Sequence, residues 1–248
     1  MYGRNTDDLA ISLGLPLGGT AAGEPVTVNI SDPARGGAGP HGLIQGAEGS
    51  GKTSTLVTMI SLLCAAYSPQ RLMVWIVSPR TNSPSRALQQ LPHVTLQPEI
   101  DGWGAPVGQA ALATITSEMD RRAQLAASGA LDAEPTLFVA FDQCDEWVAC
   151  VEGFAVMLND MLRGSHRLGI HVLISTQNLT KMPSLPLDTL SYRICHRTMD
   201  ARSSRLAIGT DEAAWLPVEA PGAALLVTSG TQHVTRFHVQ RVDDTNSA

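Results

Sequence analysis

The sequence predicts an α/β domain built on a mainly parallel sheet with helices on both faces. Short apolar runs, suited to buried strands, alternate along the 248 residues with longer stretches of helical spacing. Such alternation is typical of strand–helix–strand units, whose strands lie parallel. Hydrophobic residues make up 44% of the chain and aromatic residues only 4%, which favours an aliphatic core between helices and a sheet.

The expected elements follow in a regular order. Strands are predicted at 26–30, 41–45, 72–77, 136–141, 171–175, 192–197, 223–228 and 234–239, and helices at 53–67, 110–128 and 154–167. A chain of this length can bury one large core. We expect a polar, Gly-rich and poorly ordered lead-in over 1–23, a domain over 24–240 and a polar tail over 241–248.

Charge and cysteine content argue against several classes of protein. The net charge is −6, with no obvious basic face, so nucleic acid is an unlikely partner. The four cysteines have no zinc-ligand spacing, and buried thiols indicate a reducing compartment. The N-terminus does not resemble a signal peptide, and the longest apolar run, 56–67, is shorter than a membrane span. These features predict a cytoplasmic chain without a membrane span.

The segment G46-A-E-G-S-G-K-T53 fits the phosphate-loop pattern G-x-x-x-x-G-K-[ST] at every position. It lies between a predicted strand and a predicted helix, where backbone N–H groups and the helix dipole can hold phosphates. Lys52 is expected to reach the β- and γ-phosphates, and the Thr53 hydroxyl to bind Mg²⁺. ATP with Mg²⁺ is therefore the predicted ligand.

The predicted nucleotide contacts are Gly46, Ala47, Glu48, Gly49, Ser50, Gly51, Lys52, Thr53 and Ser54. Glu48 is an unusual residue so close to phosphate, because its carboxylate carries the same sign of charge. Either it points outward or it lowers the affinity of the loop.

A second motif ends the apolar strand at 136–141. Asp142 follows that strand, as in a Walker B motif, and is expected to hold Mg²⁺ opposite Thr53. Many P-loop proteins that hydrolyse ATP have a glutamate directly after the Walker B aspartate, and this glutamate acts as the general base. This chain has Gln143 at that position. An amide cannot accept the proton of the attacking water, and loss of a general base costs about 10²- to 10⁴-fold in rate. Glu146 lies one helical turn further on. The sequence predicts slow hydrolysis at most.

Together with these motifs, R163-G-S-H-R-L-G-I-H-V-L-I-S-T-Q177 resembles the FtsK/SpoIIIE family of P-loop motors, and within it an EccC ATPase module of type VII (ESX) secretion. The other shared segments are G39-P-H-G-L43, L91-P-H93, E118-M-D-R-R122, L168-G-I-H171, S191-Y-R193 and R197-T198. The resemblance runs from about Leu15 to Val239. It implies that 24–240 is an FtsK/SpoIIIE-type ATPase domain with a RecA-like core.

The resemblance also implies roles for residues outside the phosphate loop. Thr176 and Gln177 correspond to a γ-phosphate sensor at a strand end. An arginine reaching a neighbouring subunit is expected in such assemblies. The candidates are Arg193, Arg197, Arg202 and Arg205. The implied partners are other ATPase modules and a secreted protein, and the resemblance brings the chain to a membrane only through a secretion complex.

The chain departs from the family pattern at three places. Gln143 replaces the glutamate of an Asp-Glu pair, S78-P-R-T-N82 replaces an Asp-Phe-Lys-Gly-Gly segment, and Ser165-His166 replaces a Gly-Arg pair. Three functions stay open. The first is an ATP-binding, weakly hydrolysing module of a type VII secretion motor. The second is an FtsK-type DNA translocase, and the third is a non-hydrolysing, nucleotide-dependent interaction module.

Overall fold

The computed structural model describes residues 14–32, 36–78, 88, 90–96, 105–229 and 233–240. The strands are β1 (Gly14–Gly19), β2 (Pro25–Asn29), β3 (His41–Gln45), β4 (Leu72–Val77), β5 (Val94–Leu96), β6 (Thr136–Phe141), β7 (Ile170–Thr176), β8 (Tyr192–His196), β9 (Ala223–Thr228) and β10 (Thr235–Val239). They form one ten-stranded sheet in the order β2-β1-β10-β9-β8-β3-β7-β6-β4-β5.

The described α-helices are α1 (Lys52–Ala66), α3 (Ala105–Ser128), α4 (Cys144–Cys150), α5 (Phe154–Gly164) and α6 (Ala201–Ile208). Short 3₁₀ turns are η2 (Leu131–Ala133), η3 (Ser165–Leu168), η4 (Leu179–Lys181), η5 (Leu187–Thr189) and η6 (Glu212–Trp215). Among the described residues, none of these helices combines the length and the apolar character needed to cross a membrane.

The sheet has a parallel half and an antiparallel half. Strands β8, β3, β7, β6, β4 and β5 pair in parallel. Strands β9, β10, β1 and β2 continue the sheet beyond β8 with antiparallel pairings. Parallel neighbours need crossover connections, and α1, α3 and α5 provide these between the parallel strands. The expected mainly parallel sheet is therefore confirmed, with an antiparallel extension.

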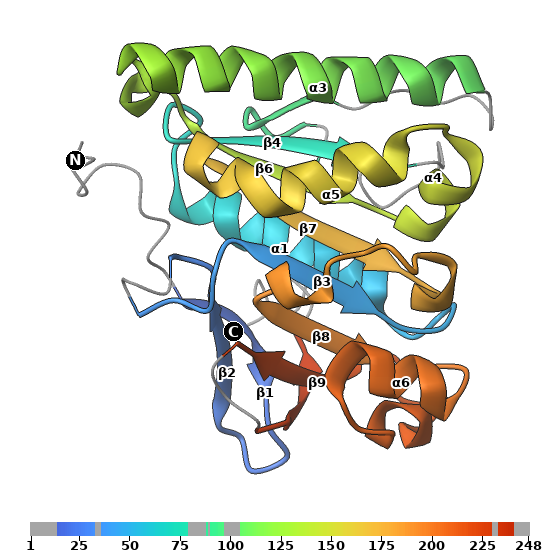
Figure 1. Ribbon diagram of the computed structural model, residues 1–248. Helices are drawn as coiled ribbons and strands as arrows, with labels where there is room; N and C mark the ends of the chain where they lie inside the picture. The colour runs from blue at the N-terminus through green and yellow to red at the C-terminus, as the bar shows by residue number, and fades with distance from the viewer. Residues whose placement is uncertain are drawn as a thin grey trace.

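Helices cover both faces of the sheet, with α3 and α5 on one side and α1 on the other (Figure 1), and a cluster of buried hydrophobic residues lies on each face. On β6, alternate residues point to opposite sides, so Val139 packs towards α3 and α5 while Phe138 packs towards α1. Helix α3 contributes Ala111 and Ile115, spaced one turn apart, to the cluster on its side. The predicted helices on both faces are thus confirmed.

The lead-in differs from expectation over residues 14–23. Residues 14–19 form β1, and Leu15 and Leu17 are buried between the sheet and α1. Three of the six residues in GLPLGG are glycine, which is depleted in strands, so the sequence carries little strand signal. Pairing with β2 and β10 supplies the order that local propensity does not.

Three further elements were not predicted, namely β5, α4 and α6. The caps of α6 were visible in the sequence. The Asp200 carboxylate accepts from the Ser203 backbone N–H at 2.7 Å, and Gly209 ends the helix with φ 82°. Helix α5 ends at Gly164, earlier than predicted, and the chain continues in the 3₁₀ turn η3.

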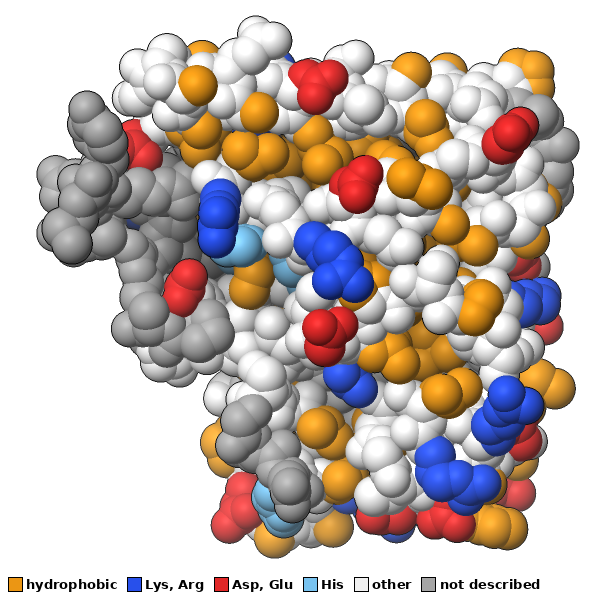
Figure 2. Space-filling view, in the orientation of Figure 1, with side chains coloured by type: hydrophobic (Ala, Val, Ile, Leu, Met, Phe, Trp, Pro, Cys, Tyr) orange, Lys and Arg blue, Asp and Glu red, His pale blue; other side chains and the backbone are white. Residues whose placement is uncertain are grey.

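The face that carries α3 and α5 is mixed in charge. Lys and Arg side chains are interspersed there with Asp and Glu rather than gathered into one basic surface (Figure 2). This arrangement agrees with the net charge of −6.

Candidate nucleotide-binding site

The predicted site residues gather at one edge of the sheet, where parallel strands end. In the strand register Gln45 of β3 pairs with Thr176 of β7, and Phe141 of β6 pairs with Ile174 of β7. The phosphate loop, Gln177 and Asp142 therefore follow neighbouring strand ends. Strand β7 lies between the phosphate-loop strand β3 and the Walker B strand β6. Ligands of open α/β sheets bind at such carboxyl edges.

The phosphate loop has the backbone that its glycines allow. Gly49 and Gly51 have positive φ angles of 71° and 111°, and α1 begins at Lys52 directly after Gly51. At Gly46, an added Cβ would lie 2.5 Å from the Ser50 hydroxyl and 2.7 Å from the His196 Cβ. Glu48 is exposed at the tip of the loop, which favours the first of the two alternatives, that it points outward.

Lys52 lies under the loop rather than on its surface. Its side chain is buried, and its Nζ donates to the Ala47 carbonyl at 2.9 Å. The Ser50 hydroxyl donates to the same carbonyl at 2.7 Å. Burial lowers the pKa of the Lys52 ammonium from its ordinary value, and the carboxylates of Asp142 and Asp145 oppose that shift. The cation is thus held within the loop beside two acids.

Asp142 is buried at the end of β6. Its Oδ2 accepts from the Ser78 hydroxyl at 3.4 Å, and its backbone N–H donates to the Val77 carbonyl at 2.9 Å. Burial raises the pKa of this carboxyl from its ordinary value, and the charge of Lys52 works in the opposite direction. Its Oδ1 is buried, with no hydrogen-bond partner in the described part of the chain.

The residues present fit a hydrated Mg²⁺ ion. Mg²⁺ prefers oxygen ligands and keeps most of its waters, so it needs only one or two protein oxygens near the phosphates. The unpaired Oδ1 of Asp142 and the Thr53 hydroxyl at the start of α1 are oxygens of this kind. When bound, the ion would offset the negative charge of the phosphates.

Asp145 joins the segment that follows β6 to the end of β7, and sequence reasoning missed it. It is buried in the first turn of α4, and its Oδ1 accepts from the Thr176 hydroxyl at 2.8 Å and from the Gln177 backbone N–H at 3.2 Å. The one sign of Asp145 in the sequence was an acidic residue about one helical turn after Asp142. The partners lie 31 and 32 residues away along the chain, so no local pattern reveals the contact.

Gln143 occupies a special backbone position. It has φ 51°, the one positive φ among the described non-glycine residues, and directly precedes α4. The side chain is 9% exposed, and its Oε1 is buried without a hydrogen-bond partner among the described residues. Such backbone conformations cost free energy and cluster at functional sites.

His196, at the end of β8, is a second residue that sequence reasoning missed. Its ring lies behind the phosphate loop, with Nδ1 3.0 Å from the Ala223 carbonyl and Nε2 2.8 Å from the Thr55 hydroxyl. A carbonyl only accepts, so Nδ1 carries the proton and Nε2 accepts from Thr55. Burial lowers the pKa of His196 to about 4, so the ring is neutral near pH 7.

The four candidate arginines differ in their surroundings. Arg193 is partly buried and donates to the backbone carbonyls of Leu187, Leu190 and Ala207, so its guanidinium is engaged inside the domain. Arg202 and Arg205 are exposed on α6, and Arg205 lies 3.9 Å from Asp211. The backbone carbonyl of Arg197 accepts from the Ala47 N–H at 2.7 Å, which brings this residue beside the phosphate loop.

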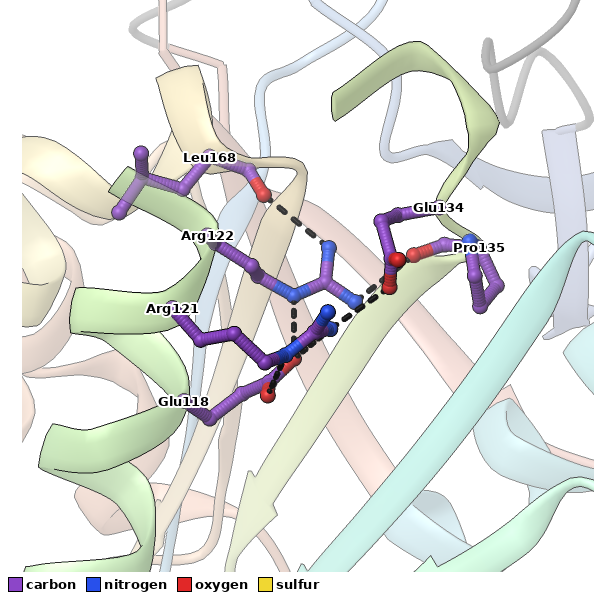
Figure 3. A network of polar contacts seen from close by, with 6 residues as sticks. All are labelled: Glu118, Arg121, Arg122, Glu134, Pro135 and Leu168. Atoms are coloured by element: carbon purple, nitrogen blue, oxygen red, sulfur yellow. Dashed lines mark hydrogen bonds and ion pairs between the residues drawn. The ribbon is translucent and has the colours of Figure 1, made fainter. Parts of the chain in front are cut away.

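Two of the segments shared with the family meet at the amino ends of β6 and β7, on the side of the sheet away from the phosphate loop. Arg122 is 1% exposed and donates to Glu118 Oε1 at 2.7 Å, to the Leu168 carbonyl at 3.1 Å and to the Pro135 carbonyl at 2.9 Å (Figure 3). Pro135 directly precedes β6, and Leu168 lies just before β7. Arg122 thereby ties α3 to the starts of β6 and β7, the two strands that Asp142 and Gln177 follow.

Comparison with known proteins decides the family. The FtsK/SpoIIIE family model matches residues 3–186, well over half of the chain. The chain belongs to the FtsK/SpoIIIE family. The resemblance seen in the sequence and the P-loop ATPase fold are both confirmed.

Relatives within the FtsK/SpoIIIE family come from type VII secretion. The ESX secretion system protein EccC of Thermomonospora curvata is 32% identical, over 91% of this chain and 18% of its own length. The ESX-4 secretion system protein EccC4 of Mycobacterium tuberculosis is 33% identical, over 91% of this chain and 20% of its own length. The cytoplasmic domain of the T. curvata type VII secretion ATPase EccC superposes with a TM-score of 0.86 at 29% identity, over 96% of this chain and 30% of that one.

The chain thus spans about a fifth of the length of these curated relatives. Its match to them covers one part of a longer protein. Of the departures from the family pattern, Gln143 and Ser165-His166 lie in the described structure, whereas residues 79–82 lie outside it.

Proposed function

We propose that this FtsK/SpoIIIE domain is an ATP-binding module of a type VII secretion motor that hydrolyses ATP slowly. The observation that carries the proposal is the combination of a well-formed phosphate loop with Gln143 at the position of the expected general base. The buried Lys52 and Asp142 supply the charges that a Mg–triphosphate complex needs.

We propose that the chain's own residues bind and orient the nucleotide and a water molecule. Lys52 and the loop N–H groups bind the β- and γ-phosphates, while Thr53 and Asp142 would hold Mg²⁺. Asp145 holds the Gln177 backbone N–H at the end of β7, and we assign the Gln177 side-chain amide to contact with the γ-phosphate. Gln143 could orient a water molecule but could not take its proton, so the expected turnover is low.

Partners and location follow from the proposed role. We expect other ATPase modules of a secretion complex to be partners, with a secreted protein as the transported substrate, and the domain to work on the cytoplasmic side. Large apolar side chains on α6, η6 and their flanks support a protein contact. Met199 is 81% exposed, Trp215 76% and Val218 69%.

Nucleotide binding and turnover, measured on the same preparation, test the proposal. Wild-type protein should bind Mg-ATP and gain thermal stability from it, because a ligand that binds only the native state stabilises that state. Lys52→Ala should lose both effects, and Lys181→Ala, on the exposed side of η4, is the matched control. Wild-type protein that neither binds Mg-ATP nor gains thermal stability would refute the proposal.

One specific observation favours a second candidate function. Gln143 also suits a module that never hydrolyses ATP and uses the bound nucleotide only to hold a neighbouring module. Steady-state turnover separates the two. A slow but measurable rate that disappears in Asp142→Asn supports the motor, whereas binding without any turnover supports the interaction module.

A further inference from the structure

The residues that follow β7 form a short segment whose shape is fixed by hydrogen bonds. The Thr176 hydroxyl accepts from the Asn178 backbone N–H at 3.2 Å, and the Asn178 side-chain oxygen accepts from the Thr180 backbone N–H at 2.9 Å. The second of these bonds caps η4. We call residues 176–181 the strand-end segment. Gln177, the residue assigned to contact with the γ-phosphate, lies inside it.

One buried carboxylate holds the start of this segment. Oδ1 of Asp145 accepts from the Thr176 hydroxyl at 2.8 Å and from the Gln177 backbone N–H at 3.2 Å. Asp145 is only 3% exposed, and a buried carboxylate costs free energy unless it is hydrogen-bonded. Hydrogen bonds to a charged acceptor are roughly twice as strong as neutral ones. The strand-end segment is therefore fastened to α4 by two charge-assisted bonds.

These bonds also determine which group of the segment remains available to a phosphate. A hydroxyl has a single proton, and Thr176 donates this proton to Asp145, so its hydroxyl has no second proton for a phosphate. The Gln177 backbone N–H donates to the same carboxylate oxygen. The side-chain amide of Gln177 carries two further N–H donors. Of the Thr176–Gln177 pair, the Gln177 side chain is therefore the donor that remains for the γ-phosphate.

Helix α4 gives Asp145 a rigid support beside the end of β6. The helix begins directly after Gln143, whose backbone carbonyl accepts from the Glu146 N–H at 2.9 Å. Trp147 is 3% exposed and stacks on Phe154 of α5, with the ring centroids 5.7 Å apart. Asp145 thus joins the ends of two neighbouring strands, β6 and β7. Precise positioning of a functional group depends on support of this kind.

We propose that Asp145 is a positioning residue that lets the site distinguish ATP from ADP. By holding the strand-end segment, it directs the Gln177 side-chain amide at the γ-phosphate, which ADP lacks. The inference rests on the proposed nucleotide-binding function and deepens it, because it assigns the response to the nucleotide state to a specific contact. Asp145 acts on the nucleotide through Gln177.

The test measures, by calorimetry, the affinities for ADP and for a non-hydrolysable ATP analogue, each with Mg²⁺. Asp145→Ala should lower the ratio of analogue affinity to ADP affinity on the order of tenfold, the usual effect of losing a hydrogen bond to a charged group, and leave ADP affinity unchanged. Asp145→Asn keeps the oxygen without the charge, so the ratio should fall about threefold, which is half of that free energy. Asp160→Ala, which removes an exposed acid on α5, is the matched control and should bind both ligands as wild type does.

A double-mutant cycle tests whether Asp145 acts through Gln177. Gln177→Ala should lower the ratio as Asp145→Ala does, and the double variant should lose little more than either single variant, because both changes remove the same contact. If Asp145→Ala does not fold, Asp145→Asn replaces it in the cycle. Additive losses would mean that the two residues act independently, and would refute the positioning role.

The remaining outcomes separate this inference from the nucleotide site as a whole. A wild-type ratio in both Asp145 variants refutes the positioning role while nucleotide binding stands. An equal loss of affinity for both ligands refutes it too, because it indicates a general structural role, and so does wild-type protein that binds both ligands equally well. Wild-type protein that binds neither ligand refutes the nucleotide-binding function, and the positioning role with it.

Discussion

Gln143 follows Asp142 directly and lies at the turn into α4, in a backbone conformation that side chains rarely adopt. If the missing carboxylate limits the rate, Gln143→Glu should raise steady-state ATP hydrolysis by about 10²-fold, because a general base is restored in nearly the same volume. The measurement is turnover at saturating Mg-ATP, and Gln143→Asn, which keeps an amide, is the control. An unchanged rate in Gln143→Glu would mean that another deficiency, such as a missing neighbouring module, limits hydrolysis.

A second effect at the scale of single residues concerns pH. Burial lowers the pKa of His196 to about 4 and that of His41 to about 3 in the folded protein, from an ordinary value of 6.5. The unfolded chain therefore binds more protons below pH 6.5. The stability contributed by the neutral rings is complete above pH 6.5 and is lost as the pH falls towards 4.

This loss should reach several kcal/mol between about pH 6.5 and pH 4, because each pKa unit corresponds to about 1.4 kcal/mol. Urea unfolding at a series of pH values measures it. His196→Gln should flatten the dependence, whereas His233→Ala, whose side chain is exposed, should not. A stability that stays constant from pH 7 to pH 4.5 would contradict the buried, neutral state of these rings.

The placement of the candidate site was predictable where it depends on local spacing. The phosphate loop and Asp142 follow from patterns of adjacent residues, and the strand register brings them to one edge. Asp145 and His196 escaped because their partners are distant along the chain, with His196 and Thr55 141 residues apart. One sequence without aligned relatives does not reveal which distant side chains meet.

At the scale of elements, the strands were predicted best. β3, β4, β6 and β9 begin and end at the predicted residues, because continuous apolar runs bounded by polar residues mark buried strands. β1 and β5 have no such run. Helix α6 is only eight residues long and is polar on average. These elements are stabilised by neighbouring strands and by helix caps, and the periodicity of hydrophobic residues does not reveal either.

Arg122 links α3 to the sheet, and we expect its replacement to lower the free energy of unfolding strongly. Removing its side chain leaves the Leu168 and Pro135 carbonyls without their donors and takes one of two arginines from Glu118 (Figure 3). Arg122→Met should therefore lower the free energy of unfolding by roughly 3–5 kcal/mol. Lysine cannot make all three contacts at once, so Arg122→Lys should be only a partial rescue.

The neighbouring Arg121 provides the matched control. It pairs with Glu118 and Glu134 but is 44% exposed, so Arg121→Gln should cost less than about 1 kcal/mol. Urea unfolding at pH 7 compares the variants. Equal costs for Arg122→Met and Arg121→Gln would show that burial of the guanidinium adds nothing to the tie between α3 and the sheet.

At the scale of the whole molecule, the balance of charge argues against DNA translocation. A DNA motor holds phosphates with Lys and Arg, and its affinity falls steeply as salt rises. This chain has 17 such residues against 23 Asp and Glu, and they are mixed with acids on the face that Figure 2 shows. We therefore expect DNA binding to be weak, with a dissociation constant in or above the range of non-specific binding, about 10⁻⁴–10⁻⁶ M.

Titration with duplex DNA at 50 mM and 200 mM salt, with and without Mg-ATP, measures this property of the surface. The expected result is weak binding at both concentrations and no stimulation of ATP turnover by DNA. Nanomolar affinity at 50 mM salt that falls at least a thousandfold at 200 mM would indicate several phosphate contacts. Such a result, together with DNA-stimulated turnover, would favour a translocase over a secretion module, since a protein-transporting module has no use for a surface that binds phosphates along a duplex.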